Sequence, residues 1–262
     1  MSNRIGVGIV TYNRPDFFEK CLASIDRSKI SELVVVNDGT PYASVDENIL
    51  IQHATNQGVG ISKNHAFQRL LERGCDHIFI IEDDIVIKDN NVFDAYIQAG
   101  RASGLKHMMY GYHGPANKRN GVVAPRYVID YGNGLKIALN QHCVGAFCYY
   151  TRDVLDAVGL NDEAFVNAWE HVEHSYRIVK AGYIPAYWWW PDLANSNDYL
   201  DELACSEVNS TIRPQTTWKE NIINGAKHFI NKHGLSPVEI PQATVEKVTE
   251  NLKNIYKQHA NR

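Results

Sequence analysis

The chain has 262 residues, 44% of them hydrophobic and 21% charged, and a formal net charge of −4. This composition is that of a globular protein with one large α/β domain or two modest ones, and the negative charge argues against a nucleic-acid binder that neutralises phosphates. No stretch approaches the ~20 apolar residues that span a bilayer, no signal-peptide pattern opens the chain, and five scattered cysteines without a CxxC pair indicate free thiols in a reducing cytoplasm.

Predicted strands and helices alternate in the first part of the chain. Apolar runs typical of strands occupy 5–10, 33–36, 49–51 and 78–87, and apolar residues at helical spacing follow Pro15 and cover 61–73. This alternation predicts an α/β fold with a mostly parallel sheet wound by right-handed crossovers. Ligands bind such sheets at the carboxyl ends of the strands. The sequence places Thr11, Asp38 and the acidic run 82–84 at those ends.

The second half of the chain mixes both kinds of element. We expect helices over 92–104, 152–158 and 168–181, the last two each followed by a capping glycine, and strands over 122–124, 127–129 and 143–150. Residues 186–216 are interpreted as a long aromatic and polar loop. Its three tryptophans at 188–190 either stack on a sugar or seal the flank of the domain. His228 either closes over a diphosphate or lies on a helix surface.

The tail, 243–262, is predicted to be a separate helix. Its apolar residues step by three and four positions and form a narrow stripe, namely Val245, Val248, Leu252 and Ile255. We expect this stripe to pack on the body of the protein, because so short a stripe forms a weak coiled coil alone. The alternatives are a homodimer through this helix and peripheral contact with a membrane.

Three consecutive carboxylates interrupt the apolar strand at 78–87. Glu82, Asp83 and Asp84 repel one another and lose hydration at a buried sheet edge, so they require a compensating cation. A divalent metal with oxygen ligands is the natural candidate, and phosphate oxygens can complete its shell. The alternative is an acidic turn exposed to solvent.

Four segments together resemble glycosyltransferase family 2, whose members have the GT-A fold. They are VGIVTYNRP at 7–15, VVVNDGT at 34–40, NQGVGISKN at 56–64 and the acidic run. Further similarity extends over VGAF at 144–147, TRDV at 151–154 and WEHVE at 169–173. Each motif is weak alone, but their order and spacing agree. The resemblance covers residues 5 to about 185 and implies a Rossmann-like sheet flanked by helices.

A nucleotide-sugar donor requires a slot for its base, a hydrogen-bond partner on that base and a cation on its phosphates. Asp38 suits an imide N–H of uracil as an acceptor, although closing a turn is its alternative role. Lys63 would reach the base or the diphosphate, or else remain a solvated lysine. The resulting set of predicted nucleotide-binding residues is Thr11, Tyr12, Asn13, Arg14, Asp38, Asn56, Lys63, Glu82 and Asp83.

The resemblance matches Glu82-x-Asp84 to the family's DxD motif. It implies Asp84 as a ligand of Mn²⁺ or Mg²⁺, with Glu82 on the metal, a metal-bound water or the ribose. Glu82 departs from the commoner aspartate and is one methylene longer, which puts its direct coordination in question. The metal would bridge the phosphates and neutralise the leaving diphosphate.

The second predicted catalytic group is Glu170 with His171. An inverting sugar transfer requires a base that takes a proton from the acceptor hydroxyl, and in the family this is normally the aspartate of a Glu-Asp pair. His171 stands at that position, and an imidazole can act as a base near neutral pH. Glu170 would orient the acceptor or be the base itself. A third metal ligand and a helix cap are the alternatives for His171.

We therefore expect a soluble, metal-dependent inverting glycosyltransferase that moves a sugar from a nucleotide donor, with UDP favoured, to a saccharide acceptor. Residues 1–104 would bind the nucleotide, 105–216 the acceptor, and 217–262 would form a helical extension. A surface glycan or capsule would be the product, made in the cytoplasm or at the inner membrane face. The rival functions are a nucleotidyltransferase, which lacks support because no Gly-rich phosphate loop follows the first strand, and a non-catalytic nucleotide-sugar or glycan binder.

Overall fold

A computed structural model describes residues 3–42, 45–203, 210–211 and 216–260. Its centre is a six-stranded sheet in the order β3-β2-β1-β4-β11-β6. The first four strands are parallel, and β11 runs antiparallel to both β4 and β6. The strands of this sheet are β1 (Ile5–Thr11), β2 (Glu32–Asn37), β3 (Leu50–Gln52), β4 (His77–Glu82), β6 (His107–Met109) and β11 (Phe147–Thr151).

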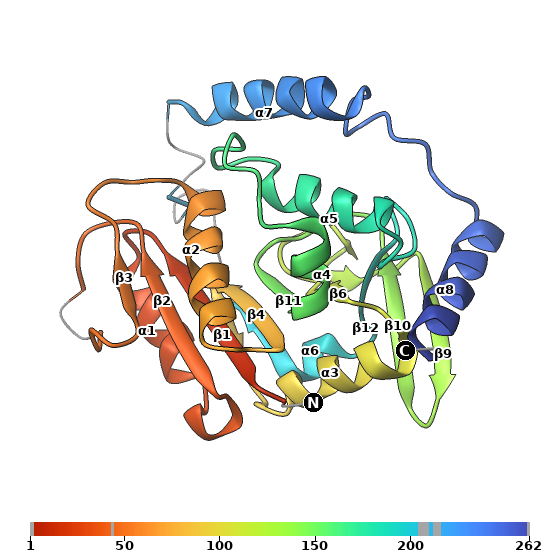
Figure 1. Cartoon of the computed structure of the whole chain (residues 1–262), viewed down its shortest axis with the longest axis horizontal. Helices are drawn as coiled ribbons and strands as arrows, with labels where there is room; N and C mark the ends of the chain where they lie inside the picture. Colours follow the sequence, from red (N-terminus) through yellow and green to blue (C-terminus); the bar gives the residue numbers. More distant parts are fainter. Residues whose placement is uncertain (1–2, 43–44, 204–209, 212–215, 261–262) are drawn as a thin grey trace.

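Helices cover this sheet (Figure 1), and its central strands are buried on both faces. The continuous apolar sequences of β1, β2 and β4 are typical of strands in this position. Helix α2 packs on β1, β2 and β4. Its close approach requires glycine in β1, because a Cβ on Gly8 would lie 2.8 Å from the Cβ of Ala66. The helices of this half are α1 (Pro15–Ala23), η1 (Arg27–Lys29), α2 (Val59–Glu72) and α3 (Val92–Ser103).

Smaller sheets complete the second half of the chain. A three-stranded antiparallel sheet has the order β12-β10-β9, β13 pairs with β5, and β7 pairs with β8. The pairing of β13 with β5 places Glu202 beside the strand that follows the acidic run. The strands are β5 (Ile85–Ile87), β7 (Lys118–Arg119), β8 (Val122–Val123), β9 (Tyr127–Gly132), β10 (Leu135–Asn140), β12 (Trp190–Leu193) and β13 (Leu200–Glu202).

The remaining helices are α4 (Arg152–Val158), α5 (Glu170–Lys180), α6 (Ser196–Tyr199), α7 (Trp218–His233) and α8 (Val245–Ala260). The predicted tail helix is confirmed as α8, which lies against α3. Val248, Leu252 and Ile255 are buried within the chain, whereas Val245 is 37% exposed. The body of the protein thus covers most of the stripe.

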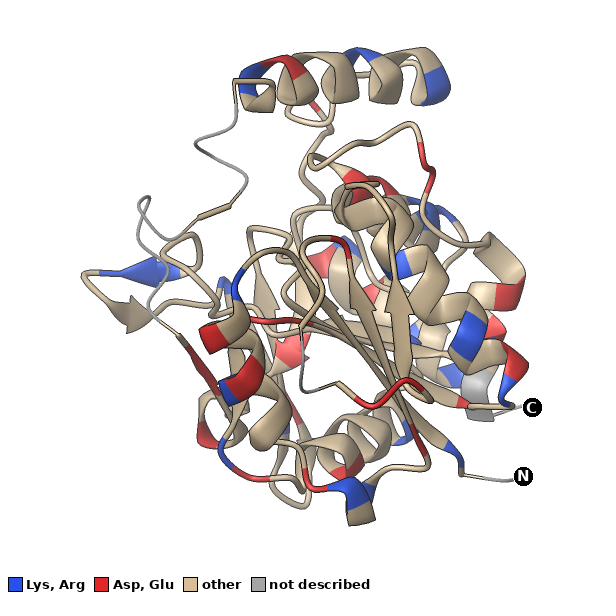
Figure 2. Cartoon of the chain, turned by 90° about the vertical axis from the view of Figure 1, so that its left-hand side faces the viewer, with Lys and Arg blue, Asp and Glu red and all other residues tan. Residues whose placement is uncertain are grey.

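The predicted α/β fold with a mostly parallel sheet is confirmed, but two sequence expectations were wrong. The strand expected over 143–150 begins only at Phe147, and residues 143–146 before it line a cavity. The loop expected over 186–216 contains β12, α6 and β13. Within the described residues, no helix is long and apolar enough to cross a membrane. Acidic and basic residues are interspersed over the fold (Figure 2).

Candidate active site

Two adjoining hollows open at the carboxyl ends of the central strands. The smaller, about 60 Å³, is lined by Thr11 and Tyr12 after β1, Asp38 after β2 and Asp83 after β4. The larger, about 890 Å³, is lined by residues from both halves of the chain, among them Asp84, Gly145, Glu170 and His171. Glu82, Arg14, Val59, Asn167 and Thr211 line both hollows. The predicted donor and catalytic residues therefore meet in one cleft.

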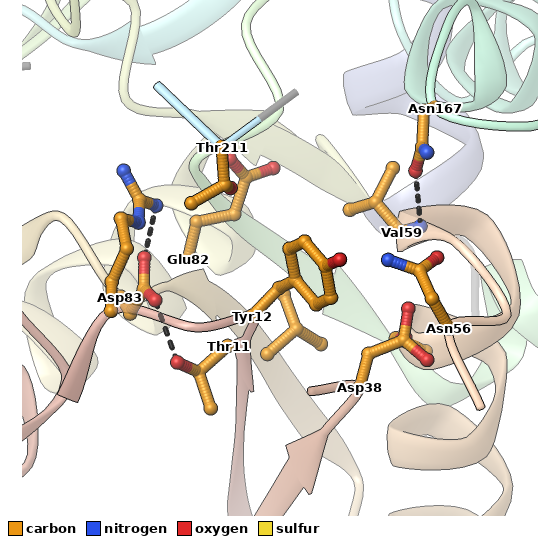
Figure 3. Close-up of a pocket in the computed structure, with 12 residues that line it drawn as sticks. Thr11, Tyr12, Asp38, Asn56, Val59, Glu82, Asp83, Asn167 and Thr211 are labelled. Carbon is orange, nitrogen blue, oxygen red and sulfur yellow. Dashed lines mark hydrogen bonds and ion pairs between the residues drawn. The ribbon is translucent and has the colours of Figure 1, made fainter. Parts of the chain in front are cut away.

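The smaller hollow contains most of the predicted nucleotide-binding residues. Figure 3 shows Tyr12 in its centre, between Glu82 and the pair Asp38 and Asn56. Asn13 turns away and braces the neighbouring loop, since its Oδ1 accepts a hydrogen bond from Thr40 N at 2.8 Å. Asn13 adopts a left-handed φ of 53°, a conformation that asparagine tolerates better than most residues.

Asp38 is 5% exposed and already has several partners. Its Oδ1 accepts from Gln57 N at 2.7 Å and contacts His53 Nδ1 at 2.6 Å, while its Oδ2 accepts from Gly58 N at 2.8 Å. These bonds hold the loop that leads into α2. The Asx turn after β2 is closed by Asn37, whose Oδ1 accepts from Gly39 N. Asp38 therefore braces the loop, and its contact with a base remains a prediction.

Asp83 points back toward β1. It accepts a hydrogen bond from Thr11 Oγ1 at 2.6 Å and forms an ion pair with Arg14. Burial raises the pKa of Asp83 to about 6, although the Arg14 charge and the Thr11 hydroxyl act in the opposite direction. Arg14, predicted from the sequence as a nucleotide ligand, thus supplies part of the positive charge that the acidic run requires.

Asp84 is 4% exposed, so the solvent-exposed acidic turn is wrong for this residue. Its Oδ2 accepts from Arg14 Nη1 at 3.5 Å, and its Oδ1 lies 3.3 Å from His113 Nε2. Burial raises the pKa of Asp84, but His113 and Arg14 outweigh it and hold the pKa below its usual range. Asp84 is therefore ionised, as a metal ligand must be.

The residues at Asp84 fit a divalent cation. Asp84 Oδ1 is buried and faces His113 at 3.3 Å without the geometry of a normal hydrogen bond, so a lone pair of this oxygen is left for a metal. Among those residues, no three His, Cys, Asp or Glu side chains are grouped to hold a metal ion by themselves. A hard cation that keeps several positions for phosphate and water needs only one or two protein ligands.

Glu82 is bound to a lysine instead. Its Oε1 accepts from Lys63 Nζ at 2.7 Å, and the same Nζ donates to Gly145 O at 3.1 Å and to Glu170 Oε1 at 3.5 Å. Burial alone would lower the pKa of Lys63, but Glu82 and Glu170 raise it above its usual value. Lys63 is 4% exposed, so the solvated lysine is wrong. It links the acidic run to the predicted catalytic pair.

Glu170 and His171 form a hydrogen-bonded pair at the start of α5. His171 Nδ1 lies 2.9 Å from Glu170 Oε1. Burial raises the pKa of Glu170, but the charges of His171 and Lys63 reverse this and lower it to about 2. An ionised carboxylate only accepts hydrogen bonds, so Nδ1 carries a proton, and in the neutral imidazole Nε2 is then the acceptor. The His171 side chain is 26% exposed and lines the large hollow.

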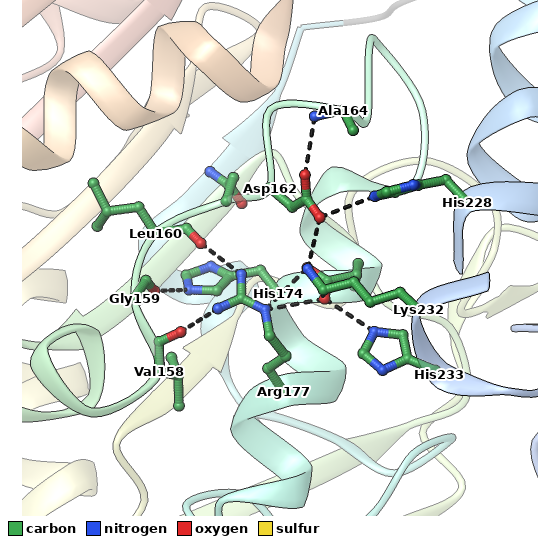
Figure 4. A network of polar contacts seen from close by, with 12 residues as sticks. Val158, Gly159, Leu160, Asp162, Ala164, His174, Arg177, His228, Lys232 and His233 are labelled. Atoms are coloured by element: carbon green, nitrogen blue, oxygen red, sulfur yellow. Dashed lines mark hydrogen bonds and ion pairs between the residues drawn. The ribbon is translucent and has the colours of Figure 1, made fainter. Parts of the chain in front are cut away.

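The loop that leads into α5 is held from outside by α7. Trp169, with a left-handed φ of 70°, donates its indole N–H to Ile222 O at 3.0 Å. A Cβ on Gly225 of α7 would lie 2.7 Å from the Trp169 ring, so glycine permits this contact. Polar contacts with α7 add to it: Asp162 bonds to His228 and Lys232 (Figure 4), and the fully buried Glu173 of α5 bonds to His233.

His228 therefore lies outside the two hollows, on the side of α7 that faces Phe165. The tryptophans also have structural roles. Trp188 and Trp189 donate their indole N–H groups to Ile240 O and Ala243 O, and Trp190 is 1% exposed. None of the three lines the two hollows, and the burial of Trp189 and Trp190 agrees with the prediction that they seal the flank of the domain.

Sequence reasoning missed several residues that line the site, among them His113, Glu202 and Asn167, and it gave no role to Gly145 within the VGAF segment. Asn167 Oδ1 accepts from Val59 N at 2.9 Å and so joins the catalytic loop to the start of α2. A Cβ on Gly145 would lie 2.9 Å from His171 Cγ. His113 and Glu202 lie in segments without a motif, and only the pairing of β13 with β5 brings Glu202 close.

No model of a known protein family matches the chain. It is 26% identical over 133 residues to an uncharacterised glycosyltransferase, EpsJ, of Bacillus subtilis strain 168, a match that covers 47% of this chain and 38% of that protein. The chain therefore spans well under half of that curated relative.

Solved structures extend the similarity to nearly the whole chain. GalNAc-T7 with UDP, GalNAc and Mn²⁺ superimposes with a TM-score of 0.57 at 10% identity, over 99% of this chain and 56% of that one. S. aureus TarS 1–349 with UDP-GlcNAc gives 0.50 at 13% identity, over 98% and 73%. The predicted fold is thereby confirmed: the chain has the GT-A fold of glycosyltransferases.

Proposed function

We propose that this protein is a metal-dependent inverting glycosyltransferase that uses a nucleotide-sugar donor and a saccharide acceptor. The observation that carries the proposal is the cleft itself, in which an ionised, buried Asp84 and a Glu170–His171 pair line the same large hollow. A cation-binding carboxylate beside an oriented base is what a sugar transfer from a nucleoside diphosphate requires.

His171 is the base in this proposal, and Glu170 is its positioning residue. Nε2 of His171 takes the proton of the acceptor hydroxyl as its oxygen attacks the anomeric carbon, and the bond to the diphosphate breaks. Glu170 holds the tautomer with Nδ1 protonated and stabilises the imidazolium that forms. Glu170 is buried and bonded to both Lys63 and His171, whereas His171 is 26% exposed at the large hollow, which favours His171 over Glu170 for this step.

The donor lies over the carboxyl ends of β1, β2 and β4. Tyr12 and Thr11 border the base, and Asp84 would hold Mn²⁺ or Mg²⁺. When bound, the cation neutralises the charge that develops on the leaving diphosphate. Lys63 keeps Glu82 and Glu170 in fixed positions at the junction of the two hollows. Among the predicted metal ligands, Asp84 is favoured over Glu82, which is bound to Lys63.

The choice of UDP is part of the proposal. It is supported by the place of Asp38 in the lining of the smaller hollow and by UDP or UDP-GlcNAc in the two similar solved structures. A surface glycan or capsule as product, and the cytoplasm or inner membrane face as location, are proposed on family resemblance alone.

A panel of nucleotide sugars tests the proposal. With Mn²⁺ present, we expect at least one UDP-sugar to raise the unfolding temperature and to be slowly hydrolysed, with both effects lost in the presence of a chelator. A protein stabilised by the donor but without hydrolysis or transfer would be the non-catalytic binder. No response to any nucleotide sugar, with or without metal, would contradict the proposal.

A further inference from the structure

His113 lies between β6 and β7, away from every motif of the sequence, yet its ring faces Asp84. Its Nε2 is 3.3 Å from Asp84 Oδ1 and 3.9 Å from Glu202 Oε2. Both atoms are buried, and among the described residues their contact is this ion pair, without the geometry of a normal hydrogen bond. Buried polar atoms are nearly always well hydrogen-bonded, so a pair held only by this longer contact can take a common further partner.

The separation of the two atoms is that of neighbouring ligands on one cation. Two donors about 2.1 Å from an octahedral ion and at a right angle to each other lie about 3.0 Å apart. The observed 3.3 Å is close to this value. Arg14 lies on the other oxygen of the carboxylate, Oδ2, and so leaves Oδ1 to face His113.

Glu202 fixes the segment that carries His113. Its Oε2 accepts from the backbone N–H of Gly114 at 2.5 Å, and its Oε1 accepts from Lys118 Nζ at 2.6 Å. With both oxygens engaged, Glu202 acts as a positioning residue. Asp84 is thus contacted by a segment that follows β6, and this segment is held by a residue of β13, which pairs with β5 directly after the acidic run.

We propose that His113 Nε2 and Asp84 Oδ1 are the two protein ligands of the divalent cation at the donor site. The inference rests on the proposed function, because the diphosphate of the donor and water would fill the remaining coordination positions of the cation. A nitrogen ligand also favours Mn²⁺ over Mg²⁺, which prefers oxygen ligands in near-ideal octahedral geometry.

The test is pulsed electron paramagnetic resonance of Mn²⁺ bound to the full chain, with and without UDP. We expect a nitrogen coupling from a directly bound imidazole in the native protein and its loss in His113→Gln, with Mn²⁺ affinity lowered at least about tenfold. His77→Gln is the matched control, because His77 lies at the opposite end of β4 and bonds to Tyr149. It should keep both the coupling and the affinity.

Absence of nitrogen coupling in the native protein would overturn the inference, and this measurement does not depend on the folding of any variant. Unchanged Mn²⁺ affinity or retained coupling in His113→Gln would also overturn it. The proposed function fails separately. Nitrogen coupling without turnover of any nucleotide sugar would support the metal site and contradict the transferase function. Turnover without nitrogen coupling would support the transferase function and contradict His113 as a metal ligand.

Discussion

Replacing His171 by glutamine tests the assignment of the base. The substitution keeps a polar side chain of similar length but removes the group that accepts the proton. Glu170 and His171 are 2.9 Å apart at the wall of the large hollow, so the change removes the group that Glu170 orients. Loss of a positioned general base costs about 10²–10⁴-fold in rate, which corresponds to roughly 3–5 kcal/mol of transition-state stabilisation.

The assay measures kcat for transfer from the donor that the nucleotide-sugar panel identifies, alongside UDP affinity in the presence of Mn²⁺. We expect kcat to fall by about 10²–10⁴-fold while UDP affinity changes little, because His171 does not line the smaller hollow. His77→Gln serves again as the control. Transfer by His171→Gln within a few-fold of the native rate would refute the assignment, and loss of UDP binding would indicate a structural role.

Three further changes follow from the same contacts. Gly145→Ala places a Cβ 2.9 Å from His171 Cγ, so kcat should fall about tenfold with little change in the unfolding midpoint. Glu173→Gln should lower the free energy of unfolding in urea by about 3–5 kcal/mol, because it removes the buried negative charge that pairs with Arg177 and Lys232; a loss below about 1 kcal/mol would contradict this. The pKa of Glu170 is lowered from 4.5 to about 2 in the folded protein. The ionised carboxylate therefore adds roughly 3 kcal/mol to the free energy of unfolding. This stabilisation is present above pH 4.5 and is lost as the pH falls toward 2. Urea unfolding across this range should show a shallower pH dependence in Glu170→Gln, and an identical slope would contradict the assignment.

The sequence was sufficient for the parallel half of the fold because its signals are local. The buried strands are continuous apolar runs, Pro15 begins α1, and Gly104 ends α3 in a left-handed conformation. The missed elements carry weaker signals. Strand β6 has three residues, and β10 includes Lys136 and Asn140. Their strand conformation comes from pairing with distant segments, which local propensity does not encode.

The candidate site follows the same division. Thr11, Asp38 and Glu82 could be placed together because parallel strands end at a shared edge. The partners of these side chains could not be predicted. The compensation of the acidic run by Arg14 and Lys63 depends on side-chain reach across the cleft. The roles of His113 and Glu202 depend on tertiary pairing that no spacing in the sequence reveals.

The central claim is that the acidic turn after β4 binds a nucleoside diphosphate through a cation. Calorimetric titration of UDP with and without Mn²⁺, in the native protein and in Asp84→Asn, tests it most directly. The account predicts that Mn²⁺ tightens UDP binding at least about tenfold, or roughly 1.4 kcal/mol, in the native protein and has no such effect in Asp84→Asn. UDP affinity that is equal in both proteins and independent of Mn²⁺, or no UDP binding at all, would contradict the claim.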